Sequence, residues 1–340
     1  MNFISYIDDM LYDTPTEGDA MNRNHLPGYE ATRPWREIQG FLPEENRISP
    51  DNRPREDWWE WKGNMIHLDR YPAPRSAVKI ILLHGVGGNG RLLSFMAVPL
   101  RRAGYEVIAP DLPGYGLNRM RDARFTYDDW IEMIVALVEA ERARDGRPAV
   151  LFGMSAGGML AYQAACLHEG VVGLVATCLL DQRVAEVREG SAITPFMGRI
   201  AIPLLGLLRR LFPAMMFPMK MVARMRAIVN DEGLLRILLR DRTSSGARVP
   251  VSFLHTLMTT SPAIEPEGFT GRPFLLVHPE KDLWTPVHLS RLFFDRLACE
   301  KKLVLLENAG HFPIERPGIV QMEEAVLEFL SSLTKRRGVQ

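Results

Sequence analysis

The chain has 340 residues and carries 41 basic and 41 acidic side chains, so its formal net charge is zero. Without an overall positive field, a main function in nucleic-acid binding is excluded. Hydrophobic residues make up 46% of the sequence, which is enough for a sizeable core. The three cysteines, Cys166, Cys178 and Cys299, are far apart, which argues against a disulfide framework or a metal cluster.

The N-terminal stretch predicts neither a secretory signal nor a membrane anchor. MNFISYIDDMLYD lacks a basic start and a long apolar run. No stretch of about 18 apolar residues follows, so a spanning helix is not expected and we expect a cytoplasmic protein. Residues 1–55 are polar and rich in proline, and predict an irregular arm with one short helix. Its aromatic residues Tyr29, Trp35 and Phe41 suggest that the arm docks on the rest of the chain.

From Asp57 onward the sequence predicts regular elements. DWWEWKGNMIHLDRY reads as a hairpin that turns at Lys62-Gly63-Asn64. Short apolar runs and helical patterns then alternate, and Thr126 is a good N-cap for one of the helices. Strands are expected at 78–85, 106–111, 149–153, 173–180, 274–279 and 302–308, and helices at 91–103, 127–144, 156–168, 287–298 and 317–334. This alternation predicts an α/β fold, a mostly parallel doubly wound sheet with helices on both faces.

The alternation stops over residues 181–271, where no run resembles a strand. The segment is rich in Met, Leu, Phe and Arg and is broken by prolines. We expect several short amphipathic helices that form a lid. The predicted domain organisation is therefore an N-terminal arm (1–55), a core (56–180 and 272–340) and a helical lid (181–271).

The candidate nucleophile is Ser155, in the stretch AVLFGMSAGGML. Gly153-Met154-Ser155-Ala156-Gly157 fits the pattern G-x-S-x-G between a strand and a helix, the context of a nucleophile elbow. Glycines two residues on either side allow the strand and the helix to approach closely. The hydroxyl then lies at a helix N-terminus, where the dipole favours developing negative charge.

A serine hydroxyl needs a base, and the base needs a carboxylate that fixes its tautomer. His311 follows the last predicted strand, at the carboxyl end of the sheet, where such sites assemble. Asp282 follows the preceding strand, and the order Ser155, Asp282, His311 is that of a nucleophile-elbow fold. Asp181 is a rival acid because it ends the strand after the nucleophile helix, and Glu280 is a third choice.

The glycine-rich stretch His84-Gly85-Val86-Gly87-Gly88-Asn89-Gly90 is a candidate oxyanion loop. We expect the backbone N–H groups of Val86 and Ala156 to be the donors and His84 to be structural. The stretch lacks the Lys-Ser/Thr end of a phosphate loop and the spacing of a dinucleotide fingerprint.

These motifs resemble those of the α/β-hydrolase superfamily. Asp111-Leu112-Pro113-Gly114-Tyr115-Gly116 is similar to its D-x-x-G-x-G loop, and the resemblance covers residues 57–334 except the lid. His-Gly-x-Gly with Gly-x-Ser-x-Gly-Gly resembles the monoacylglycerol lipase and lysophospholipase-like group. A serine at position 155 argues against haloalkane dehalogenases and epoxide hydrolases, which carry aspartate there.

The resemblance implies a serine hydrolase that cleaves carboxylic esters through an acyl-enzyme, with no metal or organic cofactor. The apolar lid favours a medium or long acyl chain, and its arginines could meet a phosphate headgroup or a membrane surface. The alternatives are an acyltransferase or peptidase with the same triad, and a ligand-binding protein on the same fold. The sequence also leaves open whether the chain forms a homodimer.

Overall fold

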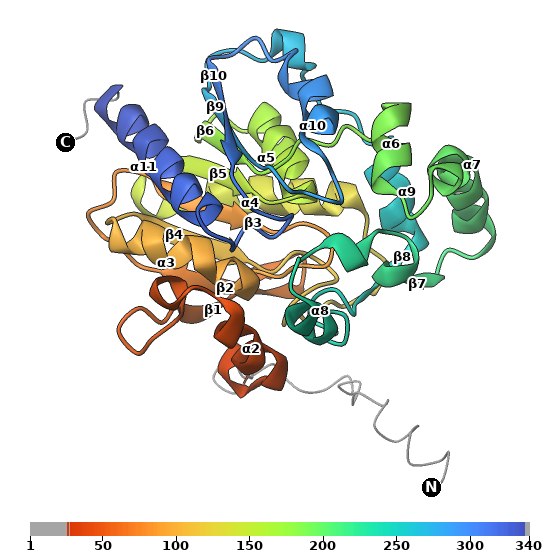
Figure 1. Ribbon diagram of the computed structural model, residues 1–340, viewed down its shortest axis with the longest axis horizontal. Coiled ribbons are helices and arrows are strands. Elements are labelled where there is room, and N and C mark those ends of the chain that lie inside the picture. Colours follow the sequence, from red (N-terminus) through yellow and green to blue (C-terminus); the bar gives the residue numbers. More distant parts are fainter. Residues whose placement is uncertain (1–25, 27, 337–340) are drawn as a thin grey trace, which may run out of the picture.

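In the part of the chain that the structure describes, a sheet of eight strands has helices on both faces (Figure 1). The computed structural model describes Leu26 and residues 28–336, so the N-terminal stretch that bears on a signal segment lies outside the described residues. The strand order is β1-β2-β4-β3-β5-β6-β9-β10. The strands are β1 (Arg55–Trp61), β2 (Asn64–Tyr71), β3 (Lys79–Leu83), β4 (Glu106–Pro110), β5 (Ala149–Gly153), β6 (Val171–Ala176), β9 (Phe274–Pro279) and β10 (Lys301–Leu306).

The sheet is parallel from β4 to β10, and the predicted hairpin, β1 and β2, adds an antiparallel edge. Strands β3 and β5 are buried along their whole length, as expected for an apolar run in the middle of a parallel sheet. In the sheet, β4 lies on one side of β3, and β5 lies on the other. The carboxyl ends of β3 and β5 therefore meet where the strand order reverses, which is where ligands bind in open α/β sheets.

Helices cover both faces of this sheet. Helices α3 and α11 lie together against one face, and α4 and α5 lie together against the other. Helix α4 begins at the predicted cap: the Thr126 side chain accepts from the Asp129 N–H, and the Asp129 side chain accepts from the Thr126 N–H. The helices are α2 (Arg33–Ile38), α3 (Ser94–Arg102), α4 (Tyr127–Asp145), α5 (Ala156–Leu167), α6 (Ala185–Ser191), α7 (Pro195–Leu211), α8 (Glu232–Leu238), α9 (Val251–Thr259), α10 (Val287–Phe294) and α11 (Gly318–Arg336).

The insertion, residues 181–271, holds α6 to α9 and gathers beyond one end of the sheet (Figure 1). Helix α7 packs between α6 and α9, and α9 rests on α4 of the core. The expectation that the insertion contains no strand is wrong in detail. Two short segments, β7 (Met216–Pro218) and β8 (Arg248–Pro250), pair antiparallel. Each has only three residues and contains proline, so neither gives a periodic signal in the sequence.

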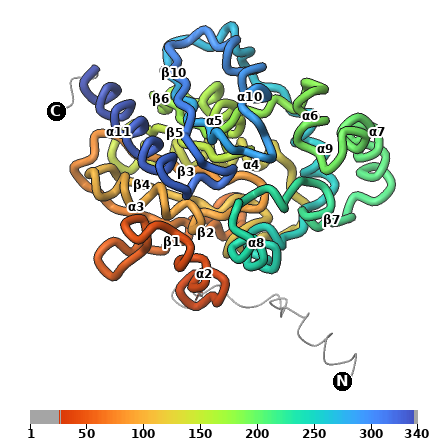
Figure 2. The backbone as a smooth tube through the Cα atoms, viewed as in Figure 1, coloured from red at the N-terminus to blue at the C-terminus, as the bar shows by residue number. Residues whose placement is uncertain are grey.

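The N-terminal arm packs beside the β1–β2 edge and against α8 of the insertion (Figure 2). Its Tyr29 and Trp35 are buried, as their aromatic character led us to expect, and Phe41 is half-buried. The rings of Tyr29 and Trp35 lie 4.9 and 5.4 Å from the guanidinium of Arg91. Arg91 is itself paired with buried Asp69 of β2, at 2.5 and 2.9 Å. The arm thus closes over a buried group of charges.

His67 lies at the centre of these charges. Its Nε2 lies 2.9 Å from Glu56, and its Nδ1 lies 3.2 Å from Asp111. Burial lowers the pKa of His67, but the hydrogen bonds of Asp111 and Glu56 and the negative charges of Asp111 and Asp69 raise this pKa to about 10. His67 therefore holds its proton in the folded chain at pH values where an unfolded chain has released it.

This proton predicts a pH-dependent stability. An unfolded histidine has a pKa of about 6.5, so the stabilisation from His67 is complete below that pH and is lost as the pH rises towards 10. Between pH 7 and pH 9 the wild type is expected to lose about 3 kcal/mol of unfolding free energy more than His67→Gln, at about 1.4 kcal/mol per pH unit. Urea unfolding at both pH values measures this difference. His288→Gln, at an exposed histidine, serves as control and should follow the wild type.

Candidate active site

Ser155 lies in the sharp turn between β5 and α5. Its φ is 56° and its ψ is −128°, a strained conformation for a residue with a side chain. A Cβ at Gly153 would lie 2.0 Å from the Gly157 carbonyl oxygen, and a Cβ at Gly157 would lie 2.3 Å from the Leu83 oxygen. Only glycine fits at these two positions. The turn thus brings α5 against β5 and β3 in the way the spacing of the motif predicts.

The structure brings Ser155, His311 and Asp282 together in one hydrogen-bonded line. The Ser155 hydroxyl lies 2.9 Å from Nε2 of His311, and Nδ1 of the same ring lies 2.8 Å from Oδ2 of Asp282. The three side chains come from loops after β5, β9 and β10, and all three residues are buried, with 5% or less of their surface exposed. This is the arrangement of a nucleophile, a base and the carboxylate that orients the base.

The Asp282 carboxylate is held by more than the histidine. Oδ1 accepts the backbone N–H groups of Trp284 and Thr285, and Oδ2 accepts the Thr285 hydroxyl. Burial raises the pKa of Asp282, but the charge and hydrogen bond of His311 and the hydrogen bonds of Thr285 lower it, to about 2. Asp282 is therefore ionised, as a group that steadies an imidazolium must be.

The two rival acids lie elsewhere. Asp181 is paired with Arg183 at 2.8 Å, and Arg183 also reaches Glu265. Glu280 accepts from the backbone N–H of Asn308 on the surface. Among the carboxylates that the structure describes, it is Asp282 that reaches the His311 ring.

The glycine-rich loop after β3 lies against the nucleophile. A Cβ at Gly85 would lie 2.7 Å from the Ser155 Cβ and 3.0 Å from the Ala156 nitrogen. Val86, the next residue, lines the cavities beside Ser155. Ala156 is the first residue of α5, so its N–H has no acceptor within the helix. The loop and the helix start thus place two backbone segments with N–H groups beside Ser155.

His84 holds this loop from behind. Its Nε2 accepts the Leu112 N–H at 2.9 Å, so its Nδ1 carries the proton and donates to the Gly85 carbonyl at 2.8 Å. Burial lowers the pKa of His84 to about 4, which keeps the ring neutral. The expectation that His84 is structural agrees with these contacts.

Three residues beside the site were missed in the sequence. Thr285 holds Asp282, the Thr177 hydroxyl accepts the Ser155 N–H at 3.0 Å, and the Trp284 ring lies 4.7 Å from that of His311. The spacing Asp-x-x-Thr at 282–285 was a readable signal, because an aspartate often accepts N–H groups two and three residues later. Thr177 and Trp284 give no comparable signal.

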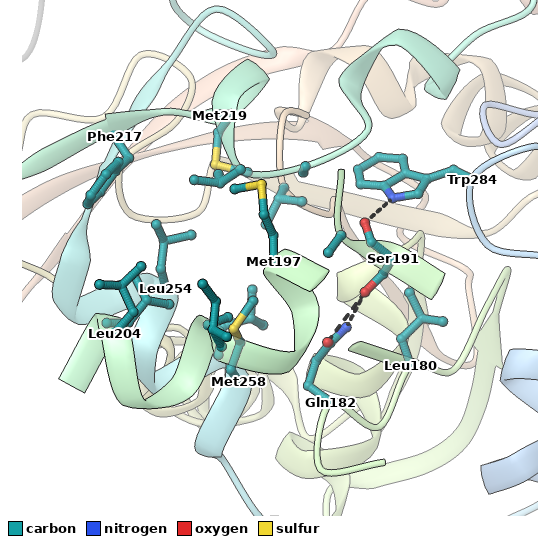
Figure 3. A pocket seen from close by; sticks show the side chains of 18 of the residues that line it. Leu180, Gln182, Ser191, Met197, Leu204, Phe217, Met219, Leu254, Met258 and Trp284 are labelled. Atoms are coloured by element: carbon teal, nitrogen blue, oxygen red, sulfur yellow. Dashed lines mark hydrogen bonds between the residues drawn. The ribbon is translucent and has the colours of Figure 1, made fainter. Parts of the chain in front are cut away.

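An apolar cavity of about 200 Å³ opens beside Ser155 (Figure 3). Helix α7 lines one side of it, and α9, β7 and the segment 219–223 line others. The apolar side chains around it are Val86, Leu180, Ala192, Met197, Ile200, Ala201, Leu204, Leu205, Leu208, Phe217, Met219, Val222, Ala223, Leu254, Leu257 and Met258. The insertion therefore supplies most of the wall.

One group of residues is spaced closely enough to hold a metal ion, but an arginine already supplies the positive charge there. Ligand atoms of Glu56, His67 and Asp69 lie within 4.8 Å of one another. Arg91 already pairs with Glu56 at 2.8 Å and with Asp69, so its positive charge stands where a cation would bind. The group is a buried ion-pair network.

The alpha/beta hydrolase family model matches residues 80–320, and the chain belongs to this family. The chain is 26% identical over 251 residues to a pimeloyl-[acyl-carrier protein] methyl ester esterase of Neisseria meningitidis, with 72% of this chain and 91% of that protein covered.

Two solved lipases share the fold. Monoglyceride lipase from Saccharomyces cerevisiae matches with a TM-score of 0.68 at 16% identity, over 86% of this chain and 98% of that one. Monoacylglycerol lipase from Paleococcus ferrophilus matches with a TM-score of 0.60 at 20% identity, over 79% and 99%. Among the described residues, no helix is both long and apolar enough to cross a bilayer.

Proposed function

We propose that this chain is a serine esterase that cleaves carboxylic esters with an apolar acyl chain. The observation that carries the proposal is the hydrogen-bonded line from Ser155 through His311 to Asp282. His311 Nε2 takes the hydroxyl proton as Ser155 Oγ attacks the carbonyl carbon. The same nitrogen then gives that proton to the departing alcohol, which leaves an acyl-enzyme. Water, deprotonated by His311, attacks the acyl carbon; the bond to Ser155 Oγ then breaks, His311 returns the proton to Oγ, and the acid leaves.

The tetrahedral intermediate carries a negative oxygen that needs donors. We assign these to the backbone N–H groups of Val86 and Ala156. The close packing of Gly85 on Ser155 and on the Ala156 nitrogen supports this assignment. The N-terminus of α5 adds a favourable dipole at the same place.

The substrate class rests on the cavity. Its wall is apolar over most of its extent, and it opens directly at Ser155. The esterase and lipase activities in the names of the relatives agree with an ester substrate. We propose that the insertion, residues 181–271, acts as a lid that encloses the acyl chain. A transferase or peptidase with the same triad remains the alternative, which added alcohol or amine acceptors would reveal.

The chain-length profile of p-nitrophenyl esters tests the acyl pocket. Each methylene that enters the cavity should raise kcat/KM by up to about fourfold, until the cavity is full. Ala201→Phe places a ring in the wall and should shift the optimum to shorter acyl chains. Leu167→Phe adds a ring on the exposed end of α5 and should leave the optimum unchanged. An optimum at acetate in the wild type would contradict the acyl pocket and leave the esterase standing.

The outer face of the insertion is unusually apolar. Three residues of α7 and Phe212 after it are exposed hydrophobics that do not line the cavity, with Phe196 at 66% and Leu211 at 57%. Arg209 and Arg210 lie in the last turn of this helix. We propose that this face contacts an anionic lipid surface. These exposed residues are Phe196, Leu207, Leu211 and Phe212.

Co-sedimentation with phosphatidylglycerol vesicles checks the lipid contact. Replacing both Leu207 and Leu211 with serine should lower the partition constant for the vesicles at least about tenfold. The reason is that each buried leucine contributes about 1.5–3 kcal/mol. Leu305→Ser, on exposed β10, is the control. Unchanged binding in the double variant would contradict the contact. A dimer that dissociates in the same variant would identify a second copy of the chain as the partner instead.

A further inference from the structure

The cavity beside Ser155 has two chemically different ends (Figure 3). Leu204, Phe217 and Leu254 lie at one end, and Gln182, Ser191 and Trp284 lie at the other. Apart from Ser155 and the Trp284 indole, Gln182 and Ser191 supply the hydrogen-bonding side chains in the described lining. If an alkyl chain filled this end, the two polar side chains would lose contact with water and gain no hydrogen bond, which costs free energy. A polar group of the ligand would supply that hydrogen bond.

The polar end lies next to the candidate base. The Trp284 ring packs 4.7 Å from the His311 ring, and its indole N–H donates to the Ser191 carbonyl at 2.9 Å. His311 is the group that hands its proton to the leaving alcohol. Trp284 thus connects this end of the cavity with His311, and an acyl chain that takes the apolar end leaves this end to the alcohol part of an ester.

The backbone beneath these two side chains is held firmly. The Arg188 guanidinium donates to the carbonyls of Gln182 and Arg183 at 2.8 and 2.7 Å. At the other residue, the Trp284 indole holds the Ser191 carbonyl. Both side chains therefore start from defined positions.

The side-chain hydrogen bonds at this end are long. Gln182 and Ser191 contact each other at 3.4 Å through either amide atom, and the Ser191 hydroxyl lies 3.5 Å from the Arg188 carbonyl. Hydrogen bonds of hydroxyl groups are commonly about 2.7–2.8 Å, so these contacts are weak. A ligand hydroxyl can replace them with shorter ones, because the amide and the hydroxyl both donate and accept.

The charge of the preferred ligand group follows from the neighbours. Gln182 and Ser191 are both uncharged. Arg183 is already bound by Asp181 and Glu265, and the Arg188 guanidinium donates to the backbone carbonyls of Gln182 and Arg183. The two side chains of the subsite are neutral donors and acceptors, as a hydroxyl group requires, and the positive charge of Arg188 disfavours an ammonium group.

We propose that Gln182 and Ser191 form a subsite for a hydroxyl group on the alcohol part of the ester. It selects esters of hydroxylated alcohols over esters of simple alkanols. The proposal rests on the proposed esterase function and names a specificity that the triad alone does not provide.

The test compares two esters of one acid, 2-hydroxyethyl octanoate and propyl octanoate, which differ by a hydroxyl in place of a methyl group. The readout is the ratio of their kcat/KM values, which does not depend on the fraction of folded enzyme. The wild type should favour the hydroxyethyl ester. In Gln182→Met and in Ser191→Ala the ratio should fall by about three- to tenfold, the range expected for one lost hydrogen bond. Leu204→Met, at the apolar end, is the matched control and should keep the wild-type ratio.

The outcomes separate this subsite from the esterase function. A ratio that stays within twofold of the wild type in both variants overturns the subsite and leaves the esterase standing. A wild type that prefers the propyl ester also overturns it. A wild type that cleaves neither ester overturns the proposed function and this subsite with it, whereas a ratio that falls in both variants and holds in Leu204→Met supports the subsite.

Discussion

Replacing Ser155 with alanine is expected to reduce ester hydrolysis by about 10⁴-fold or more in kcat. In the proposed mechanism the change removes the attacking oxygen, and His311 and Asp282 have no other nucleophile to activate in the described site. The hydrogen bond that the described structure gives the Ser155 hydroxyl is the one to His311, so the variant should fold. Initial rates on p-nitrophenyl esters, together with a thermal melt, measure both properties.

A serine outside the site provides the control for this variant. Ser332 lies in α11, where its hydroxyl donates to the Phe329 carbonyl. Ser332→Ala should therefore keep the activity of the wild type. A fluorophosphonate probe should label the wild type and Ser332→Ala but not Ser155→Ala. Undiminished hydrolysis in Ser155→Ala would refute the mechanism.

Replacing Asp282 with asparagine is expected to lower kcat by about 10³- to 10⁴-fold while leaving KM nearly unchanged. An asparagine amide can donate to Nδ1 of His311, which favours the tautomer that cannot accept the Ser155 proton at Nε2. It also carries no charge to steady the imidazolium. Steady-state kinetics on one p-nitrophenyl ester give both constants.

Asp181→Asn is the matched variant, because the sequence offers Asp181 as the rival acid. Its carboxylate pairs with Arg183 and does not reach His311, so the loss should be a few-fold at most. A large loss in Asp181→Asn with a small one in Asp282→Asn would reverse the assignment. Because the pKa of Asp282 is about 2, this carboxylate does not titrate above about pH 4. If the rate of the wild type changes with pH above about pH 4, the change must therefore come from the titration of another group.

The same assays distinguish the proposed esterase from the other functions that the sequence left open. A transferase would divert the acyl group to an added alcohol and show less free acid, with the same dependence on Ser155. A binding protein on this fold would retain ligand with slow turnover. The first result would change the acceptor of the acyl group, and the second would change the rate of turnover; neither would alter the hydrogen-bonded line of the site.

Local signals in the sequence were sufficient for the core of the fold. The apolar runs that became β3 and β5 are short and uninterrupted, as strands buried on both faces must be. The pattern around Ser155 was informative because glycine is required at 153 and 157 by backbone contacts made within the strand-turn-helix unit itself. The strand of residues 173–180 was shifted, since β6 spans Val171–Ala176 and ends before the apolar run does. An apolar residue past a strand end can still be buried, as Leu179 is.

The choice between Asp282 and Asp181 could not be made from the sequence. Both follow strands at the carboxyl edge of the sheet, so their local sequences are equivalent in this respect. The decision depends on which carboxylate reaches the loop after β10 in space, and there Asp282 lies 2.8 Å from His311. Asp181 instead pairs with Arg183, two residues along the chain, and Arg183 also pairs with Glu265 near the other end of the insertion.

By itself, the sequence determined the α/β alternation and predicted the sharp turn at Ser155 and the candidate base His311, because each of these signals lies within one short stretch of the chain. The tertiary structure alone decided the carboxylate partner of His311 and the two different ends of the cavity. It also decided the hydrogen bonds from Thr285 to Asp282 and from the Ser155 N–H to Thr177. Gln182 and Ser191 are nine residues apart, and Trp284 comes from the other side of the insertion. Their meeting at one end of the cavity is set by how the insertion packs on the core, which no periodicity or motif encodes.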